Sequence, residues 1–102
     1  MKFITIYVTH ENKQKAEKIV NFLLENKLIA CVNYSPINVS YSWKWEIVND
    51  NEIVSLLKTR SENWEKVKKY IEENHPYEIP CIIKNEVEAN DEYVKWVYEV
   101  TE

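Results

Sequence analysis

Residues 29–46 read IACVNYSPINVSYSWKWE, and this stretch decides the fold. Apolar and polar side chains alternate along it, which is typical of a β-strand with one buried face. The alternation shifts by one residue at Pro36, because the apolar side chains stand at even positions before this proline and at odd positions after it. A β-bulge produces such a shift, and a bulge is one of the few places where a strand accepts proline. We therefore expect one long strand, broken by a bulge near Pro36.

The second half of this strand is expected to overhang the rest of the molecule. Residues 37–46 would extend about 33 Å at about 3.3 Å each, whereas a body of this chain length has a radius of gyration of only about 13 Å. The overhanging arm carries the apolar side chains Ile37, Val39, Tyr41, Trp43 and Trp45. An exposed apolar strand of this kind aggregates unless another subunit covers it. We therefore predict self-association through Tyr41, Trp43 and Trp45, although the number of subunits does not follow from this argument.

The segments around the arm complete an alternating pattern of strands and helices. We expect a first strand at residues 2–9, a helix at residues 11–26 capped by Thr9, and a hairpin turn at residues 48–51 followed by a returning strand at 52–60. A second helix begins at Ser61 and stops at His75-Pro76, because proline cannot continue a helix.

A fourth strand at residues 80–87 and a last helix, which begins at Asn90 and carries an apolar stripe, end the chain. The members of this stripe are Tyr93, Trp96, Val97 and Val100. The order predicts an α+β, ferredoxin-like βαββαβ fold with a long β-hairpin and an extra C-terminal helix, in a single domain over residues 1–102.

The composition excludes several classes of function. The chain has 102 residues, a formal net charge of −4 and no glycine. An acidic chain is a poor partner for nucleic acid, and a chain without glycine cannot build a Gly-rich phosphate loop or a glycine nucleophile elbow. The sequence shows no recognisable pair of a nucleophile and a general base, so we expect no enzymatic activity. The N-terminus does not read as a signal peptide and no stretch reaches the length of a membrane span, so we expect a cytoplasmic protein.

Cys31 and His75 are the best candidates for metal ligands. Thiolate and imidazole suit Cu or Zn. The spacing of the ligands does not support a four-ligand site within one chain, so we expect a weak site at a subunit junction, completed by a carboxylate such as Glu78. The competing interpretation is structural: free cysteines in strands are commonly buried, and a histidine at a helix C-terminus commonly shapes the helix end.

Several motifs occur in a fixed order along nearly the whole chain. They are Ile29-Ala30-Cys31-Val32-Asn33, Tyr41-x-Trp43, Leu57-Lys58-Thr59, His75-Pro76-Tyr77-Glu78-x-Pro80 and Tyr93-x-x-Trp96. Together they resemble the CutA divalent-cation tolerance family, and the His-Pro-Tyr-Glu-x-Pro element is the most specific piece. The resemblance implies a trimer similar to the PII signalling proteins, with interlocked hairpins and with copper binding through the motif that holds Cys31.

The sequence also departs from the family pattern at three positions. Trp45 stands where a glycine is common near the hairpin tip, Ser42 replaces a tryptophan, and Cys81 stands where Glu or Ala is common. We expect the first two departures to change the shape of the arm tip, and the extra thiol of Cys81 to change which metal ion is preferred.

Two functions are consistent with these observations. In the first, a cytosolic homotrimer supports divalent-cation (copper) tolerance and binds Cu or Zn weakly, with no obligatory cofactor. In the alternative, a PII-like scaffold receives a small ligand or an unidentified protein partner in clefts between subunits. Lys58, Thr59 and Tyr77 are the candidate cleft residues, since a cation near a helix start can hold an anion. The competing interpretation of Lys58 and Thr59 is a solvated strand end.

Overall fold

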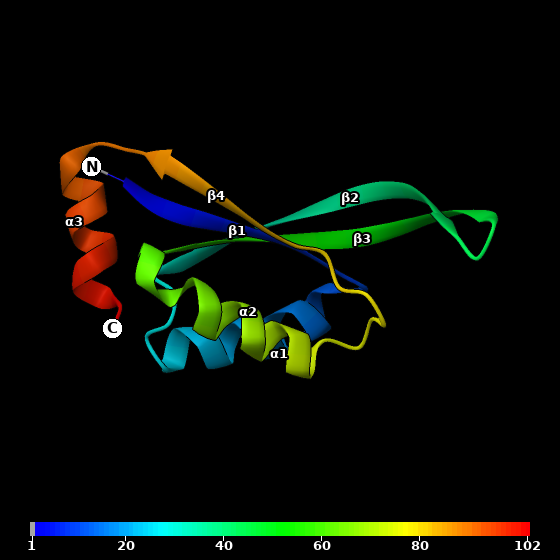
Figure 1. The fold of residues 1–102 in the computed structure, drawn as a ribbon, viewed down its shortest axis with the longest axis horizontal. Coiled ribbons are helices and arrows are strands. Elements are labelled where there is room, and N and C mark those ends of the chain that lie inside the picture. The colour runs from blue at the N-terminus through cyan, green and yellow to red at the C-terminus, as the bar shows by residue number, and fades with distance from the viewer. Residues whose placement is uncertain (1) are drawn as a thin grey trace.

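The computed structural model describes residues 2–102, which form a four-stranded antiparallel sheet with three α-helices (Figure 1). The elements are β1 (Lys2–His10), α1 (Lys13–Glu25), β2 (Cys31–Trp43), β3 (Glu46–Thr59), a short 3-10 helix (Ser61–Asn63), α2 (Trp64–Asn74), β4 (Ile82–Glu88) and α3 (Asp91–Val100). The strand order is β2-β3-β1-β4. The expected α+β fold, with its long hairpin and extra C-terminal helix, is confirmed. No helix within residues 2–102 is long and apolar enough to cross a membrane.

The core lies between one face of the sheet and the helices α1 and α2, which run side by side along that face (Figure 1). Ile4, Ile6 and Val8 project from β1 into this core. They meet Ile19, Val20 and Leu23 of α1 and Val67 and Ile71 of α2, all of them buried. We call the opposite side of the sheet the open face. A smaller cluster holds α3 against Phe3 of β1.

The expected bulge at Pro36 is wrong. β2 and β3 pair without interruption from Cys31–Lys58 to Trp43–Glu46, and Pro36 lies opposite Ile53 in this unbroken register. Since successive side chains of a strand point to opposite faces, the shift in the sequence pattern is a change of the apolar face. Val32 and Tyr34 pack against the helix-side core, whereas Ile37, Val39, Tyr41 and Trp43 project from the open face.

The expected turn at residues 48–51 is also wrong. The hairpin turns at Lys44 and Trp45, whose φ angles are 48° and 69°, and residues 48–51 lie within β3. Positive φ at both central residues is the pattern of a type I′ hairpin loop, whose twist matches the twist of the flanking strands. Lys44 and Trp45 accept this conformation although neither is Gly or Asn. Backbone strain at a bulky residue such as Trp45 costs on the order of 1 kcal/mol.

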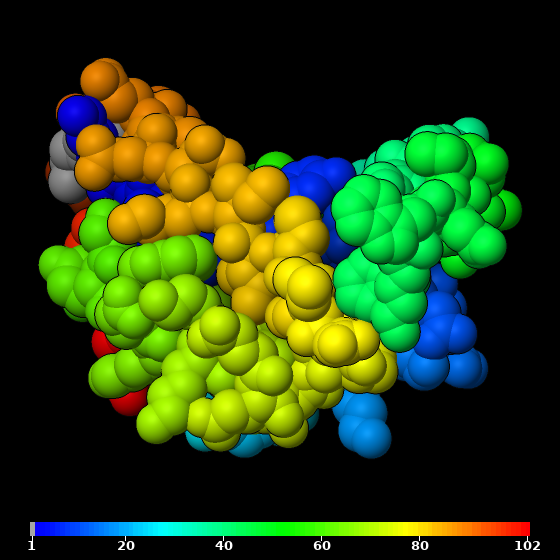
Figure 2. Space-filling view, turned by 45° about the vertical axis from the view of Figure 1, so that its right-hand side comes forward, coloured from blue at the N-terminus to red at the C-terminus, as the bar shows by residue number. Residues whose placement is uncertain are grey.

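The arm extends well beyond the body, as expected. The principal extents of the chain are 45 × 23 × 21 Å, and Figures 1 and 2 show the β2–β3 hairpin standing out from the helices. At its tip, Trp45 is fully exposed and Ile47 is 73% exposed. The tip therefore lies out of reach of any cover from its own chain.

The helix ends differ in detail from the expectation. Asn12, not Thr9, caps α1, because its side chain accepts a hydrogen bond from the Lys15 amide. Ser61 begins a 3-10 turn, and α2 follows at Trp64 and ends at Asn74, directly before His75. The buried residues of α3 are Val94 and Val97, whereas Trp96 is 39% exposed.

Arg60 fastens the C-terminal end of α3 to the end of β3. Its Nε donates to Thr101 Oγ1 at 2.9 Å, and its Nη2 donates to the carbonyl oxygens of Thr101 and Tyr98. The guanidinium also lies over the Tyr98 ring, 4.9 Å from its centroid. One planar, forked cation thus satisfies carbonyl groups that a helix end leaves without partners.

His10 is buried in the core at the end of β1, with 1% of its surface exposed. Its Nε2 lies 2.7 Å from Ser55 Oγ, and its Nδ1 has no hydrogen-bond partner within residues 2–102. Burial first, and then the neighbouring His75, lower the pKa of the His10 imidazole from 6.5 to about 4. The folded chain therefore holds this ring neutral.

Replacing Arg60 by Lys is predicted to destabilise the chain by about 1–3 kcal/mol, because a point charge cannot make the forked set of hydrogen bonds. The measurement is chemical denaturation at one fixed protein concentration. Lys66→Arg on α2 is the control and should leave the midpoint unchanged. An unchanged midpoint in the Arg60 variant would show that the forked contacts contribute nothing.

Stability is predicted to fall as the pH decreases from about 6.5 to about 4. In this range the unfolded chain protonates His10 and the folded chain does not, so the stability that is complete above pH 6.5 is lost by up to about 3 kcal/mol. The free energy of unfolding measured across this range should decrease less in His10→Gln, whose amide does not titrate. Identical pH profiles for the two proteins would contradict the prediction.

Candidate functional site

Cys31 lies at the start of β2, on the same sheet face as the apolar row of the arm. Its thiol is half-buried and lies 3.3 Å from the Tyr93 hydroxyl of α3. Burial and then the contact with Cys31 raise the pKa of Tyr93 to about 12, so this phenol stays protonated. The ammonium of Lys58, directly across from Cys31 in the sheet, lies 5.6 Å from the centre of the Tyr93 ring. A thiol, a phenol and an ammonium thus meet here on the open face.

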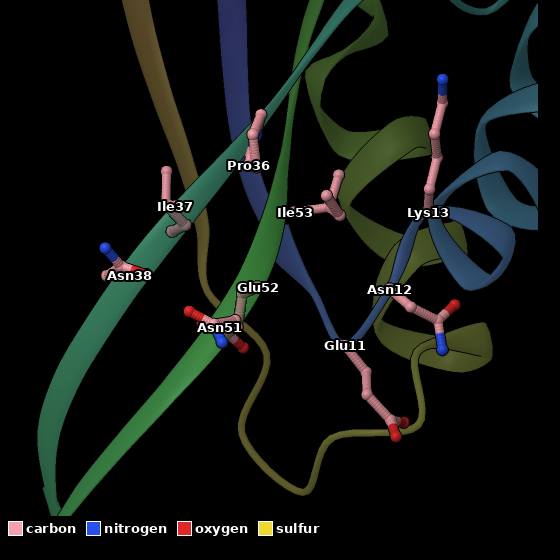
Figure 3. Close-up of a pocket in the computed structure, with 9 residues that line it drawn as sticks. All are labelled: Glu11, Asn12, Lys13, Pro36, Ile37, Asn38, Asn51, Glu52 and Ile53. Atoms are coloured by element: carbon pink, nitrogen blue, oxygen red, sulfur yellow. The ribbon is translucent and has the colours of Figure 1, made fainter.

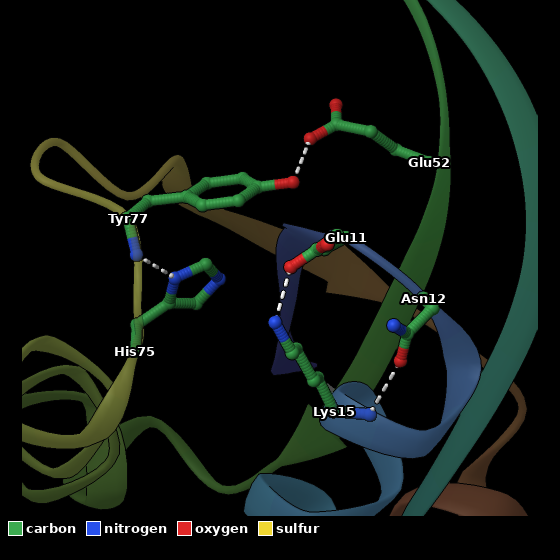
Figure 4. Close-up of polar contacts among 6 residues, drawn as sticks. All are labelled: Glu11, Asn12, Lys15, Glu52, His75 and Tyr77. Atoms are coloured by element: carbon green, nitrogen blue, oxygen red, sulfur yellow. Dashed lines mark hydrogen bonds and ion pairs between the residues drawn. The ribbon is translucent and has the colours of Figure 1, made fainter.

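His75 follows the last residue of α2 and is 8% exposed. Its Nε2 donates to the Thr9 carbonyl at 2.8 Å. Its Nδ1 accepts from the Tyr77 amide at 3.1 Å, as Figure 4 shows. These two partners fix the neutral tautomer that carries its proton on Nε2. The ring also stacks on His10 with 5.3 Å between the centroids. His75 could therefore bind a metal ion only by giving up one of its two hydrogen bonds.

Tyr77 fastens the loop after His75 to the base of the arm. Its hydroxyl donates to Glu52 Oε2 of β3, as Figure 4 shows. Burial first, and then the contact with Glu52, raise the pKa of the Tyr77 hydroxyl above its ordinary value. Glu78, the next residue, is exposed. The loop is thus held at two points, through His75 and through Tyr77.

The structure does not bring the expected metal ligands together within one chain. The His75 ring is held by Thr9, which pairs with Val54, whereas Cys31 pairs with Lys58 four positions further along β3. This separation is about 13 Å along the strand alone. Within residues 2–102, no group of three or more His, Cys, Asp and Glu side chains could hold a metal ion.

The expected ligand-cleft residues do not meet within one chain either. Thr59 is fully buried, and its hydroxyl donates to the Leu28 carbonyl at 2.6 Å. Lys58 lies with Tyr93 at one end of the sheet, and Tyr77 lies with Glu52 near the other. Only an arrangement between subunits could combine Lys58 and Tyr77, and the buried Thr59 hydroxyl is not available to such a cleft.

The expected interface residues are available on the arm. Tyr41 is 43% exposed, Trp43 is half-buried beside the Lys44 ammonium, and Trp45 is fully exposed. Their presentation agrees with a role in subunit contact, which stays a prediction for the single chain.

The sequence interpretation missed the contacts of three residues. Tyr93 is expected only as a member of the apolar stripe of the last helix, in the core or at an interface, but its hydroxyl contacts Cys31. Glu52 was only part of a returning strand, but it bonds the loop through Tyr77. His10 directly follows the first strand expected at residues 2–9, where a histidine is typical of a solvated loop, but it forms a buried pair with Ser55. Histidine and serine at this distance resemble a base and its nucleophile, yet Ser55 is fully buried and no substrate can reach it.

Comparison with known proteins agrees with this geometry. The family model described as "CutA1 divalent ion tolerance protein" matches residues 4–100. The divalent-cation tolerance protein CutA of Pyrococcus horikoshii is 41% identical over 96% of this chain and 97% of that protein. The corresponding protein of Thermotoga maritima is 40% identical, over 94% of this chain and 96% of its own length.

Solved structures give the same result for the fold. The crystal structure of Pyrococcus horikoshii CutA1 has a TM-score of 0.93 at 40% identity, over 97% of this chain and 98% of its own. The apo form of the PII-like protein CutA from Nostoc has a TM-score of 0.90 at 31% identity, over 100% of this chain and 98% of its own. The chain therefore belongs to the CutA1 divalent ion tolerance family.

Proposed function

We propose that this protein acts in divalent-cation tolerance as a cytoplasmic homotrimer that binds transition-metal ions, Cu or Zn, weakly between its subunits. The single observation that carries the proposal is the apolar side of the arm. Ile37, Val39, Tyr41 and Trp43 project from the open face, where α1 and α2 do not cover them. The number of three subunits is taken from the resemblance to PII-like proteins, because the arm itself does not indicate how many copies assemble.

The position of Cys31 supports a metal site at a subunit junction. Its thiol lies on the same sheet face as the apolar row of the arm. In this proposal, the copy that covers the arm extends along this face as far as the thiol. Thiolate is a strong ligand for Cu(I) and Zn²⁺. Since one chain brings no set of three ligands together within residues 2–102, the other ligands would come from a neighbouring copy. Cys31 is the leading ligand of this proposal, and the roles of His75 and Glu78 stay predictions.

The proposal does not include enzymatic activity. The one serine–histidine contact in the described part of the chain, between Ser55 and His10, is buried. The Tyr77 and Tyr93 hydroxyls both have raised pKa values and stay protonated near neutral pH, so they supply no general base there.

A PII-like signalling scaffold is the second candidate function. The observation that favours it is the similarity to the Nostoc protein, whose structure is described as PII-like. In this function, clefts between subunits would receive a small ligand or a protein partner. Lys58 and Tyr77, which are distant within one chain, would face such a cleft from different subunits.

Cys31→Ser is predicted to abolish saturable Zn²⁺ binding while the assembly stays intact, because a hydroxyl is a much weaker ligand than a thiolate. Isothermal calorimetry with Zn²⁺, under reducing conditions and at fixed pH, measures the binding. Light scattering on the same samples verifies the assembly.

The matched control is Cys81→Ser. Cys81 is also half-buried, but burial and Glu52 raise the pKa of its thiol, which disfavours the thiolate. This variant should bind Zn²⁺ as the parent protein does. Undiminished binding by the Cys31 variant, or equal losses in both variants, would reject Cys31 as the ligand.

A further inference from the structure

One carboxylate borders the apolar row of the arm. Glu52 of β3 lies directly opposite Ile37, the first residue of that row on β2. Paired residues of an antiparallel sheet project to the same face, so Glu52 lies on the open face with Ile37. Figure 3 shows both residues on neighbouring strands at the base of the arm. Side chains paired in this way have Cβ atoms only about 5 Å apart, so a copy packed on Ile37 also meets this carboxylate.

Tyr77 is the partner of this carboxylate within the chain. Its hydroxyl donates to Glu52 Oε2. Among residues 2–102, the Glu52 side chain has no other hydrogen bond and takes part in no ion pair. Glu52 is already half-buried in the single chain. The charge of Glu52 is therefore stabilised by one phenolic hydroxyl and by water.

The body of the chain holds Tyr77 in this position without help from a second copy. The Tyr77 amide donates to Nδ1 of His75, which is buried directly after α2. The centres of the His75 and Tyr77 rings lie 4.6 Å apart. Burial and Glu52 chiefly raise the pKa of the Tyr77 hydroxyl, and Tyr41 of the apolar row contributes as well. The hydroxyl is thus preorganised beside the row.

Cover by a second copy would remove the water from Glu52. A carboxylate that loses its water costs free energy unless hydrogen bonds replace it, whereas Ile37 gains from the same cover. A hydroxyl that donates to a carboxylate forms a charge-assisted hydrogen bond, which is roughly twice as strong as a neutral one. The Tyr77 hydroxyl therefore lowers the cost of burying the carboxylate beside Ile37.

We propose that Tyr77 is a positioning residue of the subunit contact, whose hydroxyl holds Glu52 and satisfies its charge where a second copy covers Ile37. This proposal rests on the assembly proposed above and is independent of metal binding by Cys31. The competing interpretation is that the bond between Tyr77 and Glu52 only fastens a loop of its own chain. Under the proposal, loss of the hydroxyl weakens the contact between copies, and under the competing interpretation it does not.

The rate at which copies leave the assembly tests the proposal. Isotope-labelled and unlabelled samples of the whole protein are mixed, and native mass spectrometry follows the appearance of mixed assemblies. Tyr77→Phe should exchange its copies about tenfold faster or more, because an unpaired carboxylate remains in the contact and such losses appear mainly in the dissociation rate. The matched control is Tyr70→Phe, which should exchange as the parent protein does. It removes the same hydroxyl from α2, where the Tyr70 ring stacks on Phe22 of α1.

A second substitution separates a role in the contact from a role within the chain. Glu52→Gln removes the charge, and an unpaired amide costs less to bury than an unpaired carboxylate. Added to Tyr77→Phe, it should bring the exchange rate back toward that of the parent protein. A bond that only fastens the loop predicts no such rescue, since the hydroxyl is absent from both variants. If Tyr77→Phe no longer assembles, the same rescue is measured as a return of the assembled mass.

Light scattering on the parent protein separates a failure of this proposal from a failure of the assembly. A parent protein that stays a single chain would show that both are wrong. If the parent assembles, equal exchange rates for Tyr77→Phe and Tyr70→Phe, or no rescue by Glu52→Gln, would overturn this proposal alone. Faster exchange in Tyr77→Phe that Glu52→Gln reverses would support it. None of these outcomes involves Cys31, so they are distinct from a failure of the Zn²⁺ experiment.

Discussion

The apolar side chains of β2 change from one face of the sheet to the other at Pro36, while the pairing with β3 continues unchanged. This change decides which apolar side chains of β2 the chain can bury by itself. Before Pro36, Val32 and Tyr34 complete the core under α1 and α2. After it, Tyr41 and Trp43 point away from the helices on an arm that reaches beyond the body. A continuous strand thus contributes to the core of its own chain before Pro36 and, in the proposed assembly, to a contact with another copy after it.

The arrangement of elements could be predicted from the sequence because local periodicity reports burial directly. Ile4, Ile6 and Val8 alternate on a strand, and Ile19, Val20 and Leu23 follow helical spacing, and both groups are buried together. The bulge at Pro36 was predicted wrongly because a phase shift has two physical causes, a bulge or a change of the buried face. The hairpin turn was missed because neither Lys44 nor Trp45 is a residue that usually signals positive φ.

The candidate site was less predictable, since its contacts join distant parts of the chain. Cys31 and His75 were identified by their chemistry. Nothing in the sequence near Cys31 shows its contact with Tyr93, and nothing near His75 shows its hydrogen bond to the Thr9 carbonyl. The alternative that His75 shapes a helix end agrees with its position directly after α2.

Cover of the arm by further copies is the central claim, and the molar mass in solution tests it most directly. Multi-angle light scattering coupled to size-exclusion chromatography, at micromolar concentration and neutral pH, should give three times the chain mass of 12.3 kDa. A double variant in which both Tyr41 and Trp43 are replaced by Asp or Ser should have a lower molar mass, closer to that of one chain. A stable, well-behaved single-chain particle of the unmodified protein would contradict the account.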